Sequence, residues 1–539
     1  MTEIRPAKSN LWEPIIGDTF ESFLKFVREE RGISDDHSLN IIKNNALNIL
    51  KRCVIEEDEN DFTKRTTLHL GEVQSGKTLT MCSAIALAYD NNFLISTILT
   101  GTKNILKAQN QDRIKEVLNA IDSGNTKFIY YSEPTDNDQL RTQLKDLTKK
   151  KKFIANKMIV FTMLKHQNSI KRLSKIFTSE ELNVSSYQIR SLILDDEADQ
   201  ASPNTQARKN KRSPINNSII ELRKDHPKFC TYIQVTATAQ PLFLIDKDDP
   251  MSPDFISVSD TPKAYIGIKN YFLTKKRREK FVIKIEEDDI PEPDDSSAFM
   301  PQKLQEALDH YIVATAISET LEKPLKPPFT FLCHPDWRKE EHNRYEAWIR
   351  KYINKLKEQI LDEDYEENAH EALKIPFEKA ISNLEKSSIS YEKIKNNVGK
   401  ILESNIAIRI INDKFPIEEA NLKDFWNKSN YHIIIGGNCI ERGFTVEGIL
   451  VTYMSRNPGK NSDSIQQRAR FCGFKNPNHF LLSRLWLDEE NITFFKKYIL
   501  HEETIRKSIQ ENINEYKPHA KEGFEMPLVK PFQLTRKNV

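Results

Sequence analysis

The segment GEVQSGKT at Gly71–Thr78 matches the pattern G-x-x-x-x-G-K-[ST] at every fixed position. It follows a short apolar run at Thr66–Leu70 and precedes an apolar helical run at Leu79–Tyr89. A glycine-rich turn between a strand and a helix lets backbone N–H groups converge on an anion, and the helix N-terminus adds positive potential. The sequence therefore predicts a phosphate-binding loop inside an α/β domain.

Each polar position of this loop has an expected role. Lys77 is expected to reach the β- and γ-phosphates of ATP, and the Thr78 hydroxyl is expected to ligate Mg²⁺. ATP and Mg²⁺ are thus the predicted cofactors. The residues expected to contact the nucleotide are Gly71, Gln74, Ser75, Gly76, Lys77 and Thr78.

A second motif, LILDDEAD at Leu192–Asp199, is an apolar run that ends in acids. Buried carboxylates are costly unless they are paired or bound to a metal. Asp196 is expected to organise Mg²⁺, and Glu197 is expected to be the general base that orients and deprotonates the attacking water. Asp195 is the alternative for the metal role, since the register is uncertain by one residue. Further on, Thr236–Thr238 ends another apolar run and is predicted to be a sensor that couples hydrolysis to domain movement.

A third group of motifs lies far downstream. Gly436–Gly437 follows an apolar run, Arg442 comes next, and the segment QQRARFCG follows at Gln466–Gly473. An arginine side chain can bind two phosphate oxygens at once. If hydrolysis is to move the two lobes relative to each other, a γ-phosphate held by one lobe needs such an arginine from the other lobe. Arg470 is the first choice for this arginine finger. Arg442 and Arg468 are second choices, for which an ordinary salt-bridged arginine is the favoured alternative.

The apolar runs fall into two series separated by a stretch rich in Asp, Pro and Ser. Runs of this length suit strands that are buried on both faces of a parallel sheet. The predicted fold is α/β, with two RecA-like P-loop lobes and helical N-terminal, inserted and C-terminal segments. The predicted strands are Thr66–Leu70, Phe93–Thr100, Met158–Thr162, Ser191–Leu194, Tyr232–Thr236, Phe281–Ile285, Phe329–Cys333, Tyr431–Ile435, Ile449–Met454 and Phe480–Leu487.

The same pattern divides the chain, which has 539 residues and is too long for one compact core. The predicted parts are a helical N-terminal region at 1–60, lobe 1 at 61–245, a linker at 246–300, lobe 2 at 301–490 with a helical insertion at about 338–428, and a helical tail at 491–539.

Composition limits the choice of partners. The net charge is only +2, so global charge does not argue for nucleic acid. Three basic clusters, at Lys149–Lys152, Arg208–Arg212 and Lys275–Arg278, are either nucleic-acid contacts or solvated faces offset by acids. No apolar run reaches the roughly 18 residues of a membrane span, so no membrane partner is expected. The 6 cysteines include no C-x-x-C pair, which fits a cytoplasmic location.

The order of these motifs resembles a superfamily-two helicase core and, more narrowly, the Z-one domain family of bacterial P-loop ATPases. The resemblance spans roughly residues 60–490. It implies DNA as a binding partner and a place in bacterial anti-phage or restriction-like systems, beside an operon-encoded nuclease or second ATPase. The segments that carry it are GEVQSGKT at Gly71–Thr78, Leu99–Arg113, LILDDEADQAS at Leu192–Ser202, GGNCIERGFTVEG at Gly436–Gly448 and Q-x-x-R-x-x-G-F at Gln467–Phe474.

Two features depart from the family pattern. Gly473 stands where helicases usually place another arginine, and the chain is shorter than many relatives. Such proteins are often described as endonucleases, but the sequence contains no convincing P-D…(D/E)-x-K pattern. The leading hypothesis is a Mg²⁺-dependent ATPase that translocates on or remodels DNA within a defence complex. The alternative is an ATP-gated switch that recruits an effector without translocation, and an endonuclease is the least favoured reading.

Overall fold

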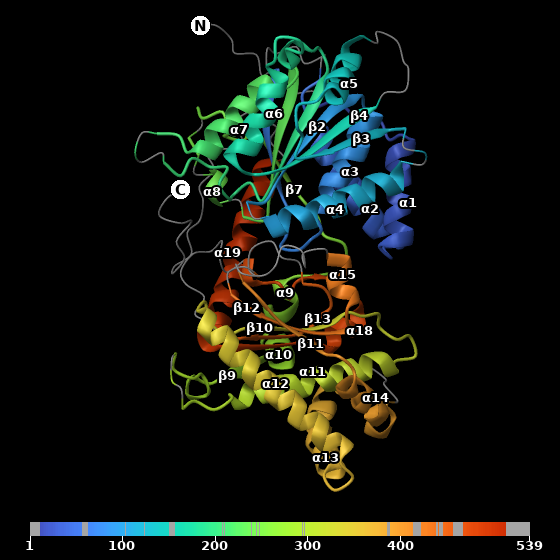
Figure 1. Ribbon diagram of the computed structural model, residues 1–539, viewed down its shortest axis with the longest axis vertical. Helices are drawn as coiled ribbons and strands as arrows, with labels where there is room; N and C mark the ends of the chain where they lie inside the picture. The colour runs from blue at the N-terminus through green and yellow to red at the C-terminus, as the bar shows by residue number, and fades with distance from the viewer. Residues whose placement is uncertain are drawn as a thin grey trace. The chain divides into compact units, whose positions relative to one another are not determined.

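The computed structural model of the chain falls into two compact units (Figure 1). Unit 1 comprises Met1–Lys263 and Glu502–Val539, and unit 2 comprises Ala264–His501. The structure describes residues 11–55, 63–102, 104–122, 124, 126–149, 157–206, 209, 211–238, 240–243, 245–246, 248–293, 295, 297–384, 389–412, 422–437, 440, 446–455 and 467–513.

The described part of unit 1 is built on a parallel sheet with the strand order β3-β4-β2-β5-β6-β1-β7. Its inner strands are buried along nearly their whole length because helices cover both faces of the sheet. The strands are β1 (Lys64–Leu70), β2 (Phe93–Thr100), β3 (Phe128–Ser132), β4 (Met158–Leu164), β5 (Arg190–Asp196), β6 (Phe229–Thr236) and β7 (Phe255–Val258).

Helices of unit 1 form a layer on each face of this sheet. One layer consists of α1, α2, α3 and α4, which share a buried core with β2, β4, β5 and β6. The other contains α5, α6 and α7, whose apolar side chains meet the opposite face. The helices are α1 (Asp18–Glu30), α2 (Asp36–Leu50), α3 (Lys77–Asp90), α4 (Asn104–Ile121), α5 (Asp138–Lys149), α6 (Gln167–Phe177), α7 (Pro214–Asp225) and α8 (Gln240–Phe243), with a 3₁₀ turn at Val184–Ser186.

Unit 2 has its own parallel sheet, with the order β11-β12-β10-β13-β15-β9 among the described residues. A separate antiparallel pair joins β14 to β8. The strands are β8 (Tyr265–Ile266), β9 (Val282–Ile285), β10 (Phe329–His334), β11 (Ala407–Ile411), β12 (Tyr431–Gly436), β13 (Ile449–Met454), β14 (Gly473–Phe474) and β15 (Arg484–Asp488).

One face of the unit 2 sheet is covered by α11, α12, α13 and α14, which share a single apolar core with β10, β12 and β13. The last helix, α19, begins in unit 2 and ends in unit 1, because the division between the units falls between His501 and Glu502. The helices are α9 (Ile268–Phe272), α10 (Lys275–Phe281), α11 (Gln302–Thr320), α12 (Lys339–Leu361), α13 (Glu366–Ile381), α14 (Tyr391–Glu403), α15 (Leu422–Asn427), α18 (Pro477–Leu482) and α19 (Glu489–Ile513), with a 3₁₀ turn at Glu287–Asp289.

These two helix-flanked parallel sheets confirm the predicted fold class. Four details differ from the prediction. Strands β3 and β11 were missed, and β11 lies inside the segment expected to be entirely helical. The apolar run at Phe480–Leu487 is divided between α18 and β15 at Ser483. The predicted linker at 246–300 also contributes β7, an edge strand of the first sheet that was not predicted, whereas β9, an edge strand of the second sheet, corresponds to the predicted strand Phe281–Ile285.

Among the described residues, no helix combines the length and apolar content needed to cross a bilayer.

Candidate functional site

The phosphate loop leaves the carboxyl end of β1, beside the ends of β6 and β5. Leu70 of β1 is paired with Thr236 of β6, and the Gly71 N–H donates to the Thr236 carbonyl at 2.8 Å. On the other side of β6, Asp196 of β5 is paired with Val235. Because the carboxyl ends of parallel strands lie at one edge of a sheet, the start of the loop and the acidic motif share this edge of unit 1.

Left-handed backbone and one serine give the loop its curled shape. Gln74 has a φ of 55° and Gly76 a φ of 81°, a region that costs little for glycine and more for other residues. The Ser75 hydroxyl lies 2.9 Å from the Glu72 carbonyl and accepts from the Glu72 N–H at 3.1 Å. These contacts close the loop on itself before the helix begins.

Helix α3 starts directly after the loop, with Gly76 as its N-cap and Lys77 and Thr78 in the first turn. A Cβ added at Gly71 would lie 3.2 Å from Cγ of Lys77, so the lysine side chain passes close over the beginning of the loop. A helix N-terminus with a lysine folded over it suits an anionic phosphate group. The structure thus gathers the predicted nucleotide contacts in one turn, and their roles toward ATP stay predictions.

Asp195 is held inside unit 1 by three neighbours. Its Oδ2 accepts from Ser202 Oγ at 2.6 Å and from the Tyr232 hydroxyl. Its Oδ1 lies 2.7 Å from the Lys165 ammonium, and the side chains of this ion pair are fully buried. These contacts engage both carboxylate oxygens of Asp195 and leave Asp196 the freer of the two acids, and the metal role of either stays a prediction.

Lys165 is a residue that the motifs did not indicate. It follows β4, and its ammonium donates to the carbonyls of Asp196, Glu197 and Gln200 at 2.8, 2.9 and 3.2 Å. These carbonyls belong to the turn that carries the acidic side chains. Lys165 therefore fixes that turn from inside the protein, in addition to neutralising Asp195.

Asp196 and Glu197 carry the remaining charge at the sheet edge. Oδ2 of Asp196 accepts from Asn110 Nδ2 of α4 at 2.9 Å. Burial, and then the charge of Glu197, raise the pKa of the Asp196 carboxyl above its usual range, while Lys77 acts in the opposite direction. Glu197 has a φ of 50°, and its buried Oε2 has no hydrogen-bond partner among the described residues. A bound cation would offset this buried negative charge, so the acids of this turn suit a Mg²⁺ ion, and the roles of Asp196 and Thr78 in holding it stay predictions.

The threonine motif at the end of β6 is hydrogen-bonded to the acidic motif. Thr236 Oγ1 donates to Asp199 Oδ1 at 2.6 Å, and the Thr238 N–H donates to Thr236 Oγ1 at 2.9 Å. The Ala198 N–H donates to the Val235 carbonyl at 3.1 Å. A movement of the acidic turn would therefore be transmitted directly to Thr236, although the sensor role itself stays a prediction.

Two of the three predicted arginines lie in the described part of unit 2. Arg470 and Arg468 are 8% and 5% exposed, and the Arg470 N–H donates to the Arg468 carbonyl at 2.6 Å. Gly473, which follows them, has a φ of 138° and pairs with Ile266. Arg442 lies outside the described residues. The role of Arg470 as an arginine finger stays a prediction.

Acids partly offset the basic clusters that the structure describes. Nη1 of Arg212 lies 3.0 Å from Oδ2 of Asp249, and Nζ of Lys275 lies 3.7 Å from Oε1 of Glu279. The cluster at Lys149–Lys152 falls outside the part of the chain whose side chains are described. One basic residue of each described cluster, Arg212 and Lys275, therefore has an acid beside it.

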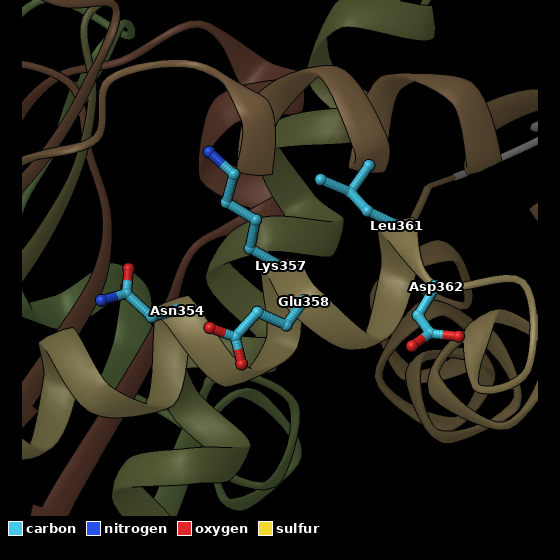
Figure 2. A pocket seen from close by; sticks show the side chains of 5 residues that line it. All are labelled: Asn354, Lys357, Glu358, Leu361 and Asp362. Atoms are coloured by element: carbon cyan, nitrogen blue, oxygen red, sulfur yellow. The ribbon is translucent and has the colours of Figure 1, made fainter.

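A hollow beside α12 is separate from these motifs. Figure 2 shows that Lys357 and Leu361 extend to one side of the helix, whereas Glu358 and Asp362 extend to the other. Asn354 completes the lining, and all of these residues come from α12 and its C-cap. The side chains do not converge on a common point, so this hollow offers no catalytic arrangement.

Several solved structures are similar to the chain at low identity. Dbp5 of S. cerevisiae, bound to RNA and ADP BeF3, is 11% identical, and the match covers 88% of this chain and 90% of Dbp5 with a TM-score of 0.42. The helicase MrfA, bound to DNA and AMPPNP, is 12% identical over 94% of this chain and 55% of MrfA, with a TM-score of 0.44.

The restriction–modification enzyme LlaBIII, bound to DNA, is 12% identical, and the match covers 90% of this chain but only 31% of LlaBIII, with a TM-score of 0.46. A search of curated protein sequences found no match. In contrast, residues 303–523 match the family model of the Z1 domain. This match covers less than half of the chain and agrees with the Z-one family that the motifs resemble.

Proposed function

We propose that the protein is a Mg²⁺-dependent ATPase whose catalytic site lies at the carboxyl edge of the unit 1 sheet. One observation carries the proposal: the phosphate loop and the acidic turn are both hydrogen-bonded to the last residues of β6. The Gly71 N–H is bonded to Thr236 and the Ala198 N–H to Val235. This arrangement supports the proposal because hydrolysis of a phosphoanhydride requires a phosphate-binding loop beside carboxylates.

The residues divide the chemistry between them. Lys77 and the N–H groups of the loop bind the β- and γ-phosphates, while Thr78 and Asp196 hold Mg²⁺, which neutralises charge on the phosphates. Glu197 orients the attacking water and accepts its proton. Lys165 and Asp195 keep the turn that carries Glu197 in place and do not touch the nucleotide.

The first experiment measures phosphate release by the purified chain with ATP, with and without Mg²⁺. We expect Mg²⁺-dependent turnover, and nucleotide binding that survives in the Glu197→Gln variant. A parent chain that neither binds nor hydrolyses ATP would overturn the proposal.

We further propose that ATP turnover drives translocation on, or remodelling of, DNA within a bacterial anti-phage or restriction-type complex. The two α/β units, the Z1 domain and the buried Arg470 of unit 2 support this finer proposal. In this account DNA favours closure of the two units on one nucleotide, and Arg470 supplies the finger. ATP turnover measured against single-stranded DNA, duplex DNA and RNA tests it, because a nucleic-acid-driven motor hydrolyses ATP faster when its substrate is present.

The offset basic clusters favour a second candidate, an ATP-gated switch that recruits an effector such as a nuclease without translocating. Arg212 and Lys275 each lie within ion-pair distance of an acid, which weakens the argument for a phosphate-binding surface. The switch predicts ATP turnover that does not respond to any nucleic acid, and a protein partner that binds in one nucleotide state only. Stimulation by DNA with strong salt dependence would exclude the switch in favour of the motor.

A further inference from the structure

The helix α19 places an arginine against the first residues of the phosphate loop. Nη2 of Arg506 donates to the Gly71 carbonyl at 2.6 Å. Its Nε lies 2.7 Å from Oε1 of Glu502 and 3.3 Å from Oε1 of Glu72. The side chain of Arg506 is 10% exposed, that of Glu502 7% and that of Glu72 25%, so this cluster is largely shielded from water.

Apolar packing fixes the part of α19 that carries Arg506. Ile505 and Ile509 are both 1% exposed and share a core cluster with Leu68 and Leu70 of β1. They are four positions apart, so they lie on one face of the helix. The strand that leads into the phosphate loop thus packs on the same turn of α19 that presents Arg506 to the loop.

The charge of Glu72 gives this contact a consequence for ligand binding. Glu72 is a carboxylate within the loop that would surround a triphosphate, and like charges in a partly buried site repel. An arginine is always charged and forks onto two acceptors at once, so Arg506 can offset Glu72 while it also holds the Gly71 carbonyl.

We propose that Arg506 is a positioning residue for the nucleotide site: it offsets Glu72 and fixes the first turn of the phosphate loop, so that ATP affinity depends on the placement of α19. The inference rests on the proposed ATPase function and adds a regulatory link to it. The Z1 family match at residues 303–523 includes Arg506, and α19 is one helix with residues in both units. The Z1 domain thereby supplies a residue that controls nucleotide affinity in unit 1.

The test compares Arg506→Gln with Lys507→Gln, measuring the Kd for a fluorescent ATP analogue and the kcat and KM for ATP. We expect Arg506→Gln to raise Kd and KM by about tenfold or more, the scale of one charge contact at a partly buried site, with a much smaller change in kcat. Lys507 is the next residue on the helix, and its side chain is 78% exposed. Its substitution should leave both constants unchanged.

A second variant separates charge from simple support of the fold. Adding Glu72→Gln to Arg506→Gln removes the carboxylate of the loop, one of the two that lose Arg506, and restores the net charge of the parent, so we expect ATP affinity to return to within about threefold of the parent value. If Arg506 has a purely structural role, the ATP affinity of the double variant should not recover. If Arg506→Gln does not fold, Glu72→Gln alone gives the answer, since it should bind ATP at least as tightly as the parent.

The outcomes also distinguish failure of this inference from failure of the proposed ATPase function. If the parent chain does not bind ATP, the proposed function fails. If the parent binds ATP and Arg506→Gln binds it as tightly as Lys507→Gln, only the role of Arg506 is overturned. Failure of Glu72→Gln to restore affinity in the double variant, or weaker binding by Glu72→Gln alone, would overturn it as well.

Discussion

The buried ammonium of Lys165 allows stability and catalysis to be tested in a single variant. Lys165→Met keeps the apolar stem and removes the charge that lies 2.7 Å from Oδ1 of Asp195. Removing one member of a fully buried ion pair costs about 3–5 kcal/mol, because the other charge is left without compensation. Since Asp195 keeps its hydrogen bonds from Ser202 and Tyr232, we expect the lower end of this range, about 3 kcal/mol.

We expect the same substitution to loosen the turn that carries Glu197, the proposed general base. Lys165 donates to the carbonyls of Asp196 and Glu197, and Glu197 has a left-handed φ of 50° that the surroundings must enforce. A displacement of a catalytic group by about 1 Å can lower a rate by roughly 100-fold. We therefore expect single-turnover hydrolysis at saturating ATP to slow by about 10- to 100-fold, while ATP still binds to the intact phosphate loop.

The assay pairs denaturant unfolding with single-turnover hydrolysis, and Lys145→Met is the matched control. The ion pair between Lys145 and Glu181 has a similar length, 2.9 Å, but its side chains are 38% and 57% exposed. An exposed pair contributes less than about 1 kcal/mol, so the control should unfold and hydrolyse ATP like the parent. If Lys165→Met matches the control in both measurements, the reasoning is refuted. Adding Asp195→Asn to Lys165→Met should recover part of the lost stability, by about 0.5–3 kcal/mol, because it removes the unpaired charge.

Three further predictions concern the chemistry. Glu197→Gln should bind ATP but hydrolyse it about 100- to 10,000-fold more slowly. Measurements of ATP binding and time courses of phosphate release will show whether Asp195→Asn has this effect instead. Arg470→Ala should leave ATP binding largely intact, lower single-turnover hydrolysis and abolish any stimulation by DNA, whereas parent rates with and without DNA would exclude the finger. Chelation of Mg²⁺ should stop turnover reversibly in the parent, and Asp196→Asn should raise the Mg²⁺ concentration needed for half-maximal turnover.

Local chemistry made the proposed nucleotide site recognisable in the sequence. The glycines, Lys77 and Thr78 of the loop are fixed by what a phosphate demands, and the acids after β5 stand out because carboxylates seldom follow a fully apolar strand. The interior strands were equally clear, since strands covered on both faces are rich in apolar and β-branched residues. The predicted strand Ile449–Met454 coincides with β13 for this reason.

The missed strands lack that signal. Strand β3 is an edge strand of its sheet and is only partly buried, and β11 combines a partly buried Arg409 with its isoleucines inside a charged region. Strand β15 was merged with the residues before it, because the apolar pattern continues from α18 across Ser483 into the strand.

The supporting residues of the site were hidden for another reason. The carbonyl partners of Lys165 lie 31 to 35 residues downstream, and Arg506 is separated from Gly71 by 435 residues. Neither Lys165 nor Arg506 belongs to a sequence motif that would indicate its contact. Only the three-dimensional arrangement shows that a lysine after β4 and an arginine on the last described helix support the same edge of the sheet.

The central claim is that the phosphate loop of unit 1 hydrolyses ATP. Its most direct test is steady-state phosphate release by the parent chain and by Lys77→Ala, at equal concentrations with Mg²⁺, after circular dichroism has shown that both are folded. The account predicts turnover by the parent that disappears in Lys77→Ala, together with weaker ATP binding by the variant. Turnover that persists unchanged in a folded Lys77→Ala chain would contradict it.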